Sequence, residues 1–580
     1  MATLRQTFSD IASAIRAKGV SGTMKPIEMA SKIGEIQNVG YLTFTAEQDA
    51  TLTLNQNGSI EPHKLLKSTD AVNWSKWENP ATNGIVLKAG ESVYIKADKD
   101  ALWRTATGDN ICNKYSSTGR IKCSGDIMSI VNLSNSEYNY FLGYLFKGMM
   151  NLTHAPELRP MTSIYRCYSN MFDGCTSLIK PPSVVCVNSC NAGCNGMFYG
   201  CNKMTTAPEL PATTLENACY QWMFGACSSL TQSPELPATT LAPWCYFNMF
   251  YNCRALKQAP QLPATNLTKY CYGNMFDGCS SLVNAPQLPA TTLAQCCYNT
   301  MFKDCKSLEQ APALPATTLA GDCYNGMFFG CTSLTTAPEL PAIVMKNGCY
   351  NTMFKDCKSL EQAPALPATT LDVYCYNDMF NGCSSLVNAP QLPATTLAQC
   401  CYSGMFYGCT SLTSAPELPA TTLATECYQD MFNGCTSLTQ SPELPATTLA
   451  NGCYFNMFRG CTSLEIGPEL PATDLAEYCY DGMFYGCSSL KRIKMNASSG
   501  FFIVDMFNGC TSLELVDMTG STGVPEIDTH VFENTNDTFK IVVPDELYGE
   551  WGGVAGWNEI FDHIVPKSMW NEDHPDDILP

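Results

Sequence analysis

The chain has 580 residues, too many for one compact hydrophobic core. Its formal net charge is −19, its pI is near 4.7, and charged residues make up only 15% of it. An acidic surface repels nucleic acid and anionic lipid, so we expect neither as a partner. The sequence contains no run of about 18 apolar residues, and its start lacks the apolar stretch of a secretory signal. We therefore expect no membrane insertion, and synthesis in the cytoplasm of the producing cell without a signal peptide.

Residues 1–39 predict two short helices. Leu4, Phe8 and Ile15 share one helical face, and Pro26 can open a second apolar-periodic stretch after two glycines. Segments of about 40 residues rarely fold alone. We therefore expect this segment to dock on another protein or on copies of itself, as a homo-oligomer with a trimer among the candidate states. Packing against the chain's own next domain stays open as the alternative.

Residues 40–143 predict a small β-sandwich. Apolar and polar residues alternate in residues 41–45 and 50–54. Residues 85–87 and 92–96 are further strand candidates, and Gly- and Asn-rich turns separate the strands. Short strands at this spacing are typical of two packed antiparallel sheets.

A Met-Phe pair recurs every 26 residues within residues 144–515. A fixed period in this range indicates a solenoid, in which each coil buries its apolar face against its neighbours. Two prolines per repeat exclude a continuous helix or a central strand, so short extended pieces joined by turns remain. The predicted fold class is therefore mainly β, with an elongated solenoid. The pairs begin at Met171, Met197, Met223, Met249, Met275, Met301, Met327, Met353, Met379, Met405, Met431, Met457 and Met483, with Leu145 one step earlier and Met506 in a shortened repeat.

Residues 516–580 predict a C-terminal cap. The periodic cysteine is lost, and a strand-like run at residues 539–543 precedes apolar positions that include Trp551 and Trp557. The last coil of a solenoid exposes its open end to water, so it needs a differently patterned covering segment.

The chain has 33 cysteines, and most of them fall on two frames that lie eight residues apart within a repeat. Three interpretations compete: buried thiols packed in columns, disulfide staples and metal-binding thiolates. The odd total and the expected reducing compartment favour packed thiols. Cys186, Cys190 and Cys194 lie close together beside Gly193, which replaces a periodic cysteine. Their spacing matches no zinc-binding pattern, so no metal site is predicted.

The sequence predicts no enzyme, no catalytic residue and no cofactor. Its five histidines form no HExxH arrangement, and neither a phosphate-binding loop nor a dinucleotide fingerprint is present. The constant residues of the repeats are Met, Phe, Leu and Cys, which a core needs and acid–base catalysis does not. Residues 298–319 are identical to residues 350–371. Duplication of a whole coil suits a tiled surface better than a catalytic pocket.

Positions that vary between repeats are expected on the exterior. The residue before each Cys-Tyr pair and the residue between Met-Phe and Gly-Cys change freely, and several are aromatic. Exposed aromatic rings at regular steps can stack on sugar rings or anchor a protein partner. Edge packing between coils stays open as the alternative. The candidate ligand-binding residues are Trp222, Trp244, Tyr270, Tyr374 and Tyr478.

The repeats resemble those of BspA-like leucine-rich repeat proteins of gut bacteria and their phages. The resemblance rests on CYQDMFNGCTSL at residues 427–438 and PELPATTL at residues 442–449, and it covers residues 144–515. Residues 543–557 are similar to the family's terminal segment, and residues 115–129 to the β-domain that often precedes the repeats. The resemblance implies a non-enzymatic adhesive surface protein with a leucine-rich-repeat-like solenoid. The 26-residue, cysteine-rich repeat is longer than the family's commoner one.

Residues 10–16 and 25–30 resemble a short module at the start of tail- and baseplate-associated proteins of gut phages. Together with the expected lack of export, this favours a phage tail fibre or receptor-binding protein in the virion, extracellular after release. Its expected partners are other virion proteins, through residues 1–39, and a bacterial surface glycan or protein. A cell-surface adhesin of a gut bacterium and a polysaccharide-degrading tail spike are the alternatives.

Overall fold

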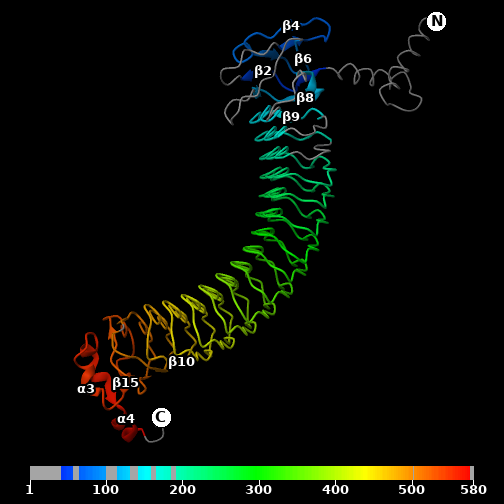
Figure 1. Cartoon of the computed structure of the whole chain (residues 1–580). Helices are drawn as coiled ribbons and strands as arrows, with labels where there is room; N and C mark the ends of the chain where they lie inside the picture. Colours follow the sequence, from blue (N-terminus) through cyan, green and yellow to red (C-terminus); the bar gives the residue numbers. More distant parts are fainter. Residues whose placement is uncertain are drawn as a thin grey trace, which may run out of the picture. The chain divides into compact units, whose positions relative to one another are not determined.

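The computed structural model describes residues 41–55, 65–98, 114–130, 142–158, 165–183, 191–500 and 502–574. The helices predicted for residues 1–39 lie outside these ranges. Packing divides the chain into two units, Met1–Leu236 and Pro237–Pro580. Within each unit, successive coils lie side by side (Figure 1).

In the described part of the chain short strands outnumber helical segments, and turns connect the strands, which confirms the predicted mainly β fold. None of the described helices has the length and apolarity needed to cross a bilayer. The strands are β1 (Leu42–Ala46), β2 (Ala50–Asn55), β3 (Leu65–Ser68), β4 (Ser75–Lys76), β5 (Ile85–Leu87), β6 (Ser92–Ala97), β7 (Lys114–Ser117), β8 (Ile121–Gly125), β9 (Leu152–His154), β10 (Ile466–Leu470), β11 (Arg492–Met495), β12 (Phe502–Ile503), β13 (Leu515–Asp517), β14 (Glu526–Ile527), β15 (Lys540–Val543) and β16 (Ile564–Pro566). The helical segments are η2 (Ile127–Ile130), α3 (Tyr548–Trp551), η3 (Trp557–His563) and α4 (Lys567–Asp573).

Two sheets form the first part of the N-terminal unit. One has the strand order β4-β3-β6-β1-β8-β9 and the other has the order β5-β2-β7. Leu52 and Leu54 of β2 are fully buried, while Thr51 and Thr53, which alternate with them, are half-buried. Side chains of a strand alternate between its two faces, so the alternation in the sequence becomes one apolar face of the sheet.

The core of this first part continues into the coils of the same unit. β9, in the first coil, pairs in parallel with β8. The Tyr115 ring lies 5.7 Å from Phe146, and Phe146 stacks 5.3 Å from Phe172 in the next coil. A solenoid needs its terminal coil covered. The sheet and the aromatic core therefore close the N-terminal end of the repeat stack, and the domain boundary placed after residue 143 stays a prediction.

Every coil contains a run of overlapping turns, seen clearly in the coil that begins at Trp244. Alternate amides donate to carbonyls of the next coil, as Trp244 N does to Lys269 O at 3.1 Å. Tyr246 N does the same to Cys271 O at 3.0 Å. The amides between them donate three residues back, as Phe247 N does to Trp244 O at 3.2 Å. The backbone donors are thus satisfied without a helix or a long strand.

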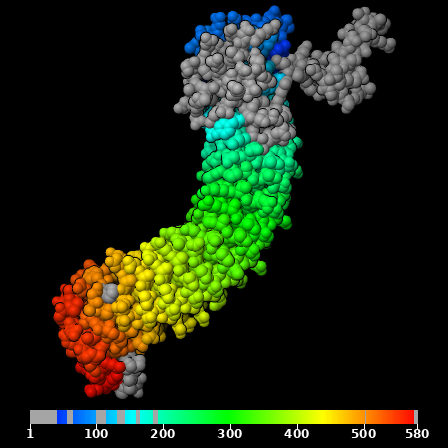
Figure 2. All heavy atoms as spheres, in the orientation of Figure 1, coloured from blue at the N-terminus to red at the C-terminus, as the bar shows by residue number. Residues whose placement is uncertain are grey.

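The interior of the C-terminal unit holds two columns of stacked rings. Phenylalanines from Phe250 to Phe484 stack with centroids 5.5–5.7 Å apart. Tyrosines from Tyr246 to Tyr480 stack at 5.6–6.2 Å. All these rings are buried. The constant residues of the repeat therefore form the core, and the coils present a continuous surface outside it (Figure 2).

The cysteines of the repeats are buried free thiols. In one column each Sγ donates to the phenylalanine carbonyl of the preceding coil, as Cys383 does to Phe354 at 3.1 Å. This confirms the packed-thiol interpretation for the two periodic frames among the described residues. Cys194 is disulfide-bonded. Cys186 and Cys190 lie outside the described residues.

The last coils of the C-terminal unit form a parallel sheet with the order β10-β11-β13-β15-β16. β15 occupies most of the run predicted as a strand at residues 539–543. Trp570 of α4 packs on Leu515 and Val542, which covers part of this sheet. The indole nitrogen of Trp557 donates to Pro525 O at 2.6 Å, so this buried ring keeps a hydrogen-bond partner.

Candidate binding site

The turn run places three residues per coil in the left-handed backbone region, four positions apart. In the coil that begins at Trp244, φ is 63° at Trp244, 57° at Asn248 and 57° at Asn252. We call the outward side chains of residues 244–252 and their equivalents in the other coils of the C-terminal unit the turn face. Its first column consists of Trp244, Tyr270, Cys296, Asp322, Gly348, Tyr374, Cys400, Glu426, Gly452 and Tyr478.

Two of the predicted binding residues meet on the turn face. Trp244 and Tyr270 stack with ring centroids 4.0 Å apart at 16°, and both are half-buried. Phe247 adds its ring edge, 4.8 Å from Trp244 and 5.7 Å from Tyr270. A Cβ on Gly273 would lie 3.0 Å from the Phe247 ring, so glycine lets this ring lie flat over the next coil. Aromatic pairs in these geometries stabilise each other by about 0.5–1.5 kcal/mol.

Trp222 belongs to the N-terminal unit and forms a similar aromatic pair there. Its ring meets Tyr199 edge-to-face at 5.9 Å and 75°. A Cβ on Gly225 would lie 2.8 Å from the Tyr199 ring, so glycine again makes room. Trp222 therefore forms an aromatic pair of the same kind as the one at Trp244.

Tyr374 and Tyr478 are the most exposed of the five predicted residues. Tyr374 is 40% exposed and Tyr478 is 62% exposed. A hydrogen bond with the Cys400 thiol raises the pKa of Tyr374, and Cys400 Sγ donates to Glu426 at 3.1 Å. This polar chain runs along the first column over three coils.

The same arrangement occurs four coils earlier. A hydrogen bond with Cys296 raises the pKa of Tyr270 to about 12, with the nearby charge of Asp322 acting in the same direction. We did not predict a role for Cys296 or Cys400. The available signal was that both cysteines share the frame of the predicted aromatic residues.

All five predicted residues have left-handed backbone conformations. The φ angles are 59° at Trp222, 63° at Trp244, 56° at Tyr270, 56° at Tyr374 and 57° at Tyr478. The left-handed region disfavours L-residues by about 1–2 kcal/mol, and bulky residues are uncommon there. Glycine occupies the same column at two coils, with φ of 58° and 60°. The first column therefore accepts glycine, yet four of its positions carry large rings, and Trp222 carries a ring at the next left-handed position of its own coil.

A model of the BspA type leucine-rich repeat region matches residues 223–361, 347–455 and 445–549 in six copies, more than half of the chain. This chain belongs to the BspA-type leucine-rich repeat family. Among solved structures it is similar to a leucine-rich repeat protein from Bacteroides ovatus, with 16% identity, a TM-score of 0.41, and coverage of 81% of this chain and 99% of that chain. It is also similar to a leucine rich cell surface protein from Faecalibacterium prausnitzii, with 14% identity, a TM-score of 0.28, and coverage of 74% and 96%. No curated protein matches the chain. The predicted BspA-like family is thus confirmed, and its phage-encoded kind stays a prediction.

Cations of the chain cover two other rings of the turn face in this BspA-type array. The Arg459 guanidinium lies 4.0 Å from the Tyr485 ring centroid, and Lys303 Nζ lies 5.3 Å from that of Phe329. A cation over a ring face at this distance is attracted by the ring's electron density. These rings are therefore less available to a ligand than those of Tyr374 and Tyr478.

A second exposed surface follows the isolated β-bridges of the C-terminal unit. Gln258, Asn284 and Gln310 pair in parallel from coil to coil, and their amide side chains are exposed. A surface hollow of about 490 Å³ interrupts this polar ladder where Ile466, 63% exposed, follows the polar residues. The hollow is lined by Thr439, Gln440, Ser441, Ser463, Glu465 and Ile466. It contains no aromatic ring, so the turn face is the better candidate for stacking on a ligand.

Proposed function

We propose that this BspA-type protein is a non-enzymatic attachment protein whose turn face binds a glycan or protein on the surface of a bacterial host cell. The left-handed conformation of the five aromatic residues carries this proposal. Tyr374 and Tyr478 are held in this unfavourable backbone region at exposed positions, which points to a role other than folding. Exposed Trp and Tyr rings provide flat apolar area and a polar edge, which suits both sugar rings and protein partners.

The chemistry of the buried thiols supports a non-enzymatic role. Burial raises the pKa of Cys435 and of Cys487 to about 12. The thiolate is the reactive form of cysteine, so these thiols are protonated and unreactive near neutral pH. The alternative of a polysaccharide-degrading tail spike requires a pair of carboxylates flanking a glycosidic bond. Oligosaccharide released from host capsule would contradict the non-enzymatic proposal.

A binding assay on whole cells tests the attachment proposal. Labelled protein is applied to a panel of gut bacteria, with and without prior treatment of the cells by periodate or protease. Loss of binding after periodate identifies a glycan receptor, and loss after protease identifies a protein receptor. Absence of binding to every strain of a panel that includes the natural host would contradict the proposal.

We further propose that a phage tail carries this protein, as a homo-oligomer docked on other virion proteins through residues 1–39. The helical pattern of that segment and its resemblance to tail-associated modules support this location. A surface adhesin of a gut bacterium is the alternative. Deletion of residues 1–39 is expected to abolish incorporation into particles and to leave thermal unfolding of the repeats unchanged. Particles that incorporate the truncated protein would contradict the docking role.

A further inference from the structure

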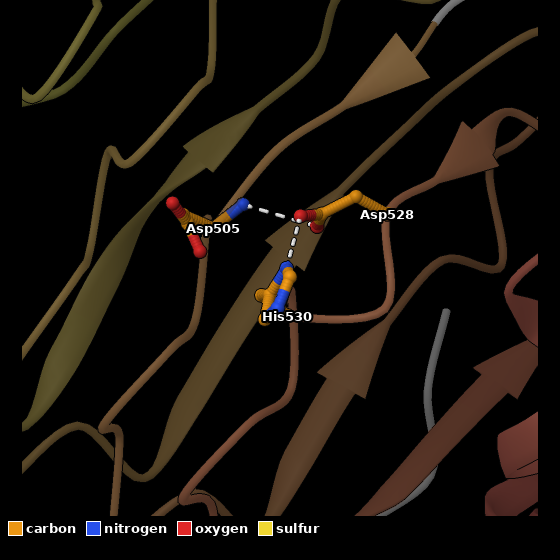
Figure 3. Close-up of side chains that lie close together, drawn as sticks. All are labelled: Asp505, Asp528 and His530. Carbon is orange, nitrogen blue, oxygen red and sulfur yellow. Dashed lines mark hydrogen bonds and ion pairs between the residues drawn. The ribbon is translucent and has the colours of Figure 1, made fainter.

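Three side chains able to bind a metal ion converge near the end of the array. Asp505 follows β12, and Asp528 and His530 follow β14, the strand that pairs in parallel with β12. One potential ligand atom from each of the three residues lies within 4.8 Å of the others. Parallel pairing of the two short strands thus sets side chains from adjacent coils side by side (Figure 3).

The Asp528 carboxylate lies at the centre of this group (Figure 3). Its Oδ2 is 3.0 Å from Nδ1 of His530, and its Oδ1 accepts from the backbone N–H of Asp505 at 3.3 Å. The side chain of Asp528 is 17% exposed and that of His530 is 60% exposed. One side of the group is therefore held by the backbone, and the histidine side is open to an entering ion.

A nearly buried carboxylate adjoins the group. Asp481 is 7% exposed, and one of its oxygens accepts from Val504 N at 3.2 Å. Within the described part of the chain, no donor lies within hydrogen-bond distance of its second oxygen. Burial, and then the charges of Asp528 and Asp505, raise the pKa of Asp481 to about 6. Asp481 therefore adds a third carboxylate close to those of Asp505 and Asp528.

The group also lacks basic partners. In the described ranges, neither Lys nor Arg forms an ion pair with Asp481, Asp505 or Asp528. Among the residues that the structure describes, the only cationic contact of these three carboxylates is that of Asp528 with His530. Carboxylates that converge without a counter-charge repel one another, and a bound divalent ion is the strongest local way to compensate them.

We propose that Asp505, Asp528 and His530 form a binding site for a divalent transition-metal ion, Zn²⁺ being the ion that this ligand set favours. Two carboxylates and one imidazole suit Zn²⁺, which takes four ligands and often keeps one position for water. Ca²⁺ requires six to eight oxygen ligands, and three side chains with an imidazole do not supply them. The ion would join adjacent coils at the end of the array and stabilise them, because only the folded chain brings the ligands together.

Calorimetric titration of the full chain with ZnCl2, after chelator treatment and in a thiol-free reductant, tests the site. We expect one tight ion per chain and a rise in the unfolding midpoint on adding Zn²⁺. Asp505→Asn and His530→Gln should each weaken binding by about 10–100-fold and remove that rise. Asp304→Asn and His154→Gln, which lie elsewhere in the chain, should bind as the unaltered protein does. Equal Zn²⁺ affinity in all five proteins, or tighter binding of Ca²⁺ than of Zn²⁺, would overturn the proposal.

Substitution with Co²⁺ distinguishes ion binding at the proposed site from ion binding by the many cysteines of the chain. Oxygen and imidazole ligands give Co²⁺ only weak visible bands, whereas thiolate ligands add an intense charge-transfer band. We expect the weak bands alone, and we expect them to disappear in His530→Gln. An intense thiolate band would place the ion on cysteines and overturn the assignment. His530 is largely exposed, so its substitution is expected to leave the metal-free unfolding midpoint unchanged.

Discussion

The regular coils of the C-terminal unit and the coils at its C-terminal end are joined in different ways. On their extended side the regular coils make isolated bridges, such as Gln310 with Thr336. β11 and β13, by contrast, pair over three consecutive residues. Each regular repeat carries two prolines on this side, such as Pro312 and Pro315, which lack the N–H that a ladder requires. β11 and β15 contain no proline, so their ladders extend.

This difference shows where each region obtains its stability. The regular coils depend on ring columns and on the turn run, where alternate amides cross to the next coil. The C-terminal coils add a backbone ladder and the cover provided by α4. Side-chain truncation should therefore be most damaging in the regular coils, and loss of a backbone donor most damaging in the sheet.

Removal of one ring from the phenylalanine column should have the largest effect. Phe354 is fully buried and stacks on Phe328 and Phe380. Phe354→Ala is expected to lower the free energy of unfolding by about 3–5 kcal/mol, because it leaves a cavity between two coils. Phe502→Ala is the control, since Phe502 is 55% exposed, and it should change stability by less than about 0.5 kcal/mol. Equal denaturant midpoints for the two variants would contradict the column as the main support.

A proline in the C-terminal sheet should have the next largest effect. Lys494 of β11 pairs with Glu469 on one side and with Asp517 on the other. Lys494→Pro removes a backbone donor from a central strand, and we expect a loss of about 1–3 kcal/mol in denaturant unfolding. Lys494→Ala removes only the partly exposed ion pair with Glu469, so it should cost less than about 1 kcal/mol. If both substitutions lower the free energy of unfolding equally, the backbone ladder contributes little to the stability of the C-terminal sheet.

The pH dependence of a regular coil should come next. Asp277 is 8% exposed, and burial raises its pKa from 3.8 to about 6, although Lys303 opposes the shift. The folded chain therefore holds this proton more tightly, so Asp277 destabilises the fold as pH rises from about 4 to 6, and fully above that range. Asp277→Asn should raise the free energy of unfolding at pH 7.5 by about 1–3 kcal/mol and change it little near pH 4. The same gain at both pH values would show that the charge is not the cause.

Relief of the left-handed backbone should have the smallest effect on stability. Tyr478→Gly removes a 62% exposed ring from a residue with φ of 57°. We expect the free energy of unfolding, measured by thermal unfolding, to stay unchanged or to rise by no more than about 1 kcal/mol. Gly549→Ala in α3, which has open space around it, is the matched control for a change at an unstrained glycine. A clear loss of stability in Tyr478→Gly would assign the ring a structural role and favour edge packing between coils.

Much of the fold could be predicted because the positions that stay constant between repeats are the buried ones. Met, Phe, Leu and Cys recur at fixed positions and form the buried columns. The variable frame before Cys-Tyr reaches the surface at Tyr374 and Tyr478 but is buried at Cys296 and Cys400. The pattern also placed Trp244 and Tyr270 in one column, which is why they could stack. The first strands of the N-terminal unit followed from their alternation. Periodicity suffices for these features because neighbouring coils repeat the same environment.

Other features depend on contacts that no local pattern reveals. The closing role of β8 and Tyr115 requires the pairing of β8 with β9, which lies in the first coil. The left-handed positions arise from amides that cross between coils, so the sequence of one repeat does not show them. The last repeat is shortened: Gly482 N donates to Val504 O, 22 residues ahead, where regular coils use 25. The spacing of Met483 and Met506 showed the shortened repeat, but it did not show that Asp505 and Asp528 would lie close together.

Binding of the double variant Tyr374→Gly/Tyr478→Gly to intact host cells tests the account most directly. Both rings are exposed, and both have a backbone conformation that glycine adopts readily. We predict that the variant unfolds at the same or a higher temperature and binds cells at least about tenfold more weakly, a loss of about 1.4 kcal/mol. Gln310→Ala, on the polar ladder, should bind as the unaltered protein does. Unchanged binding by the double variant would contradict the assignment of attachment to the turn face.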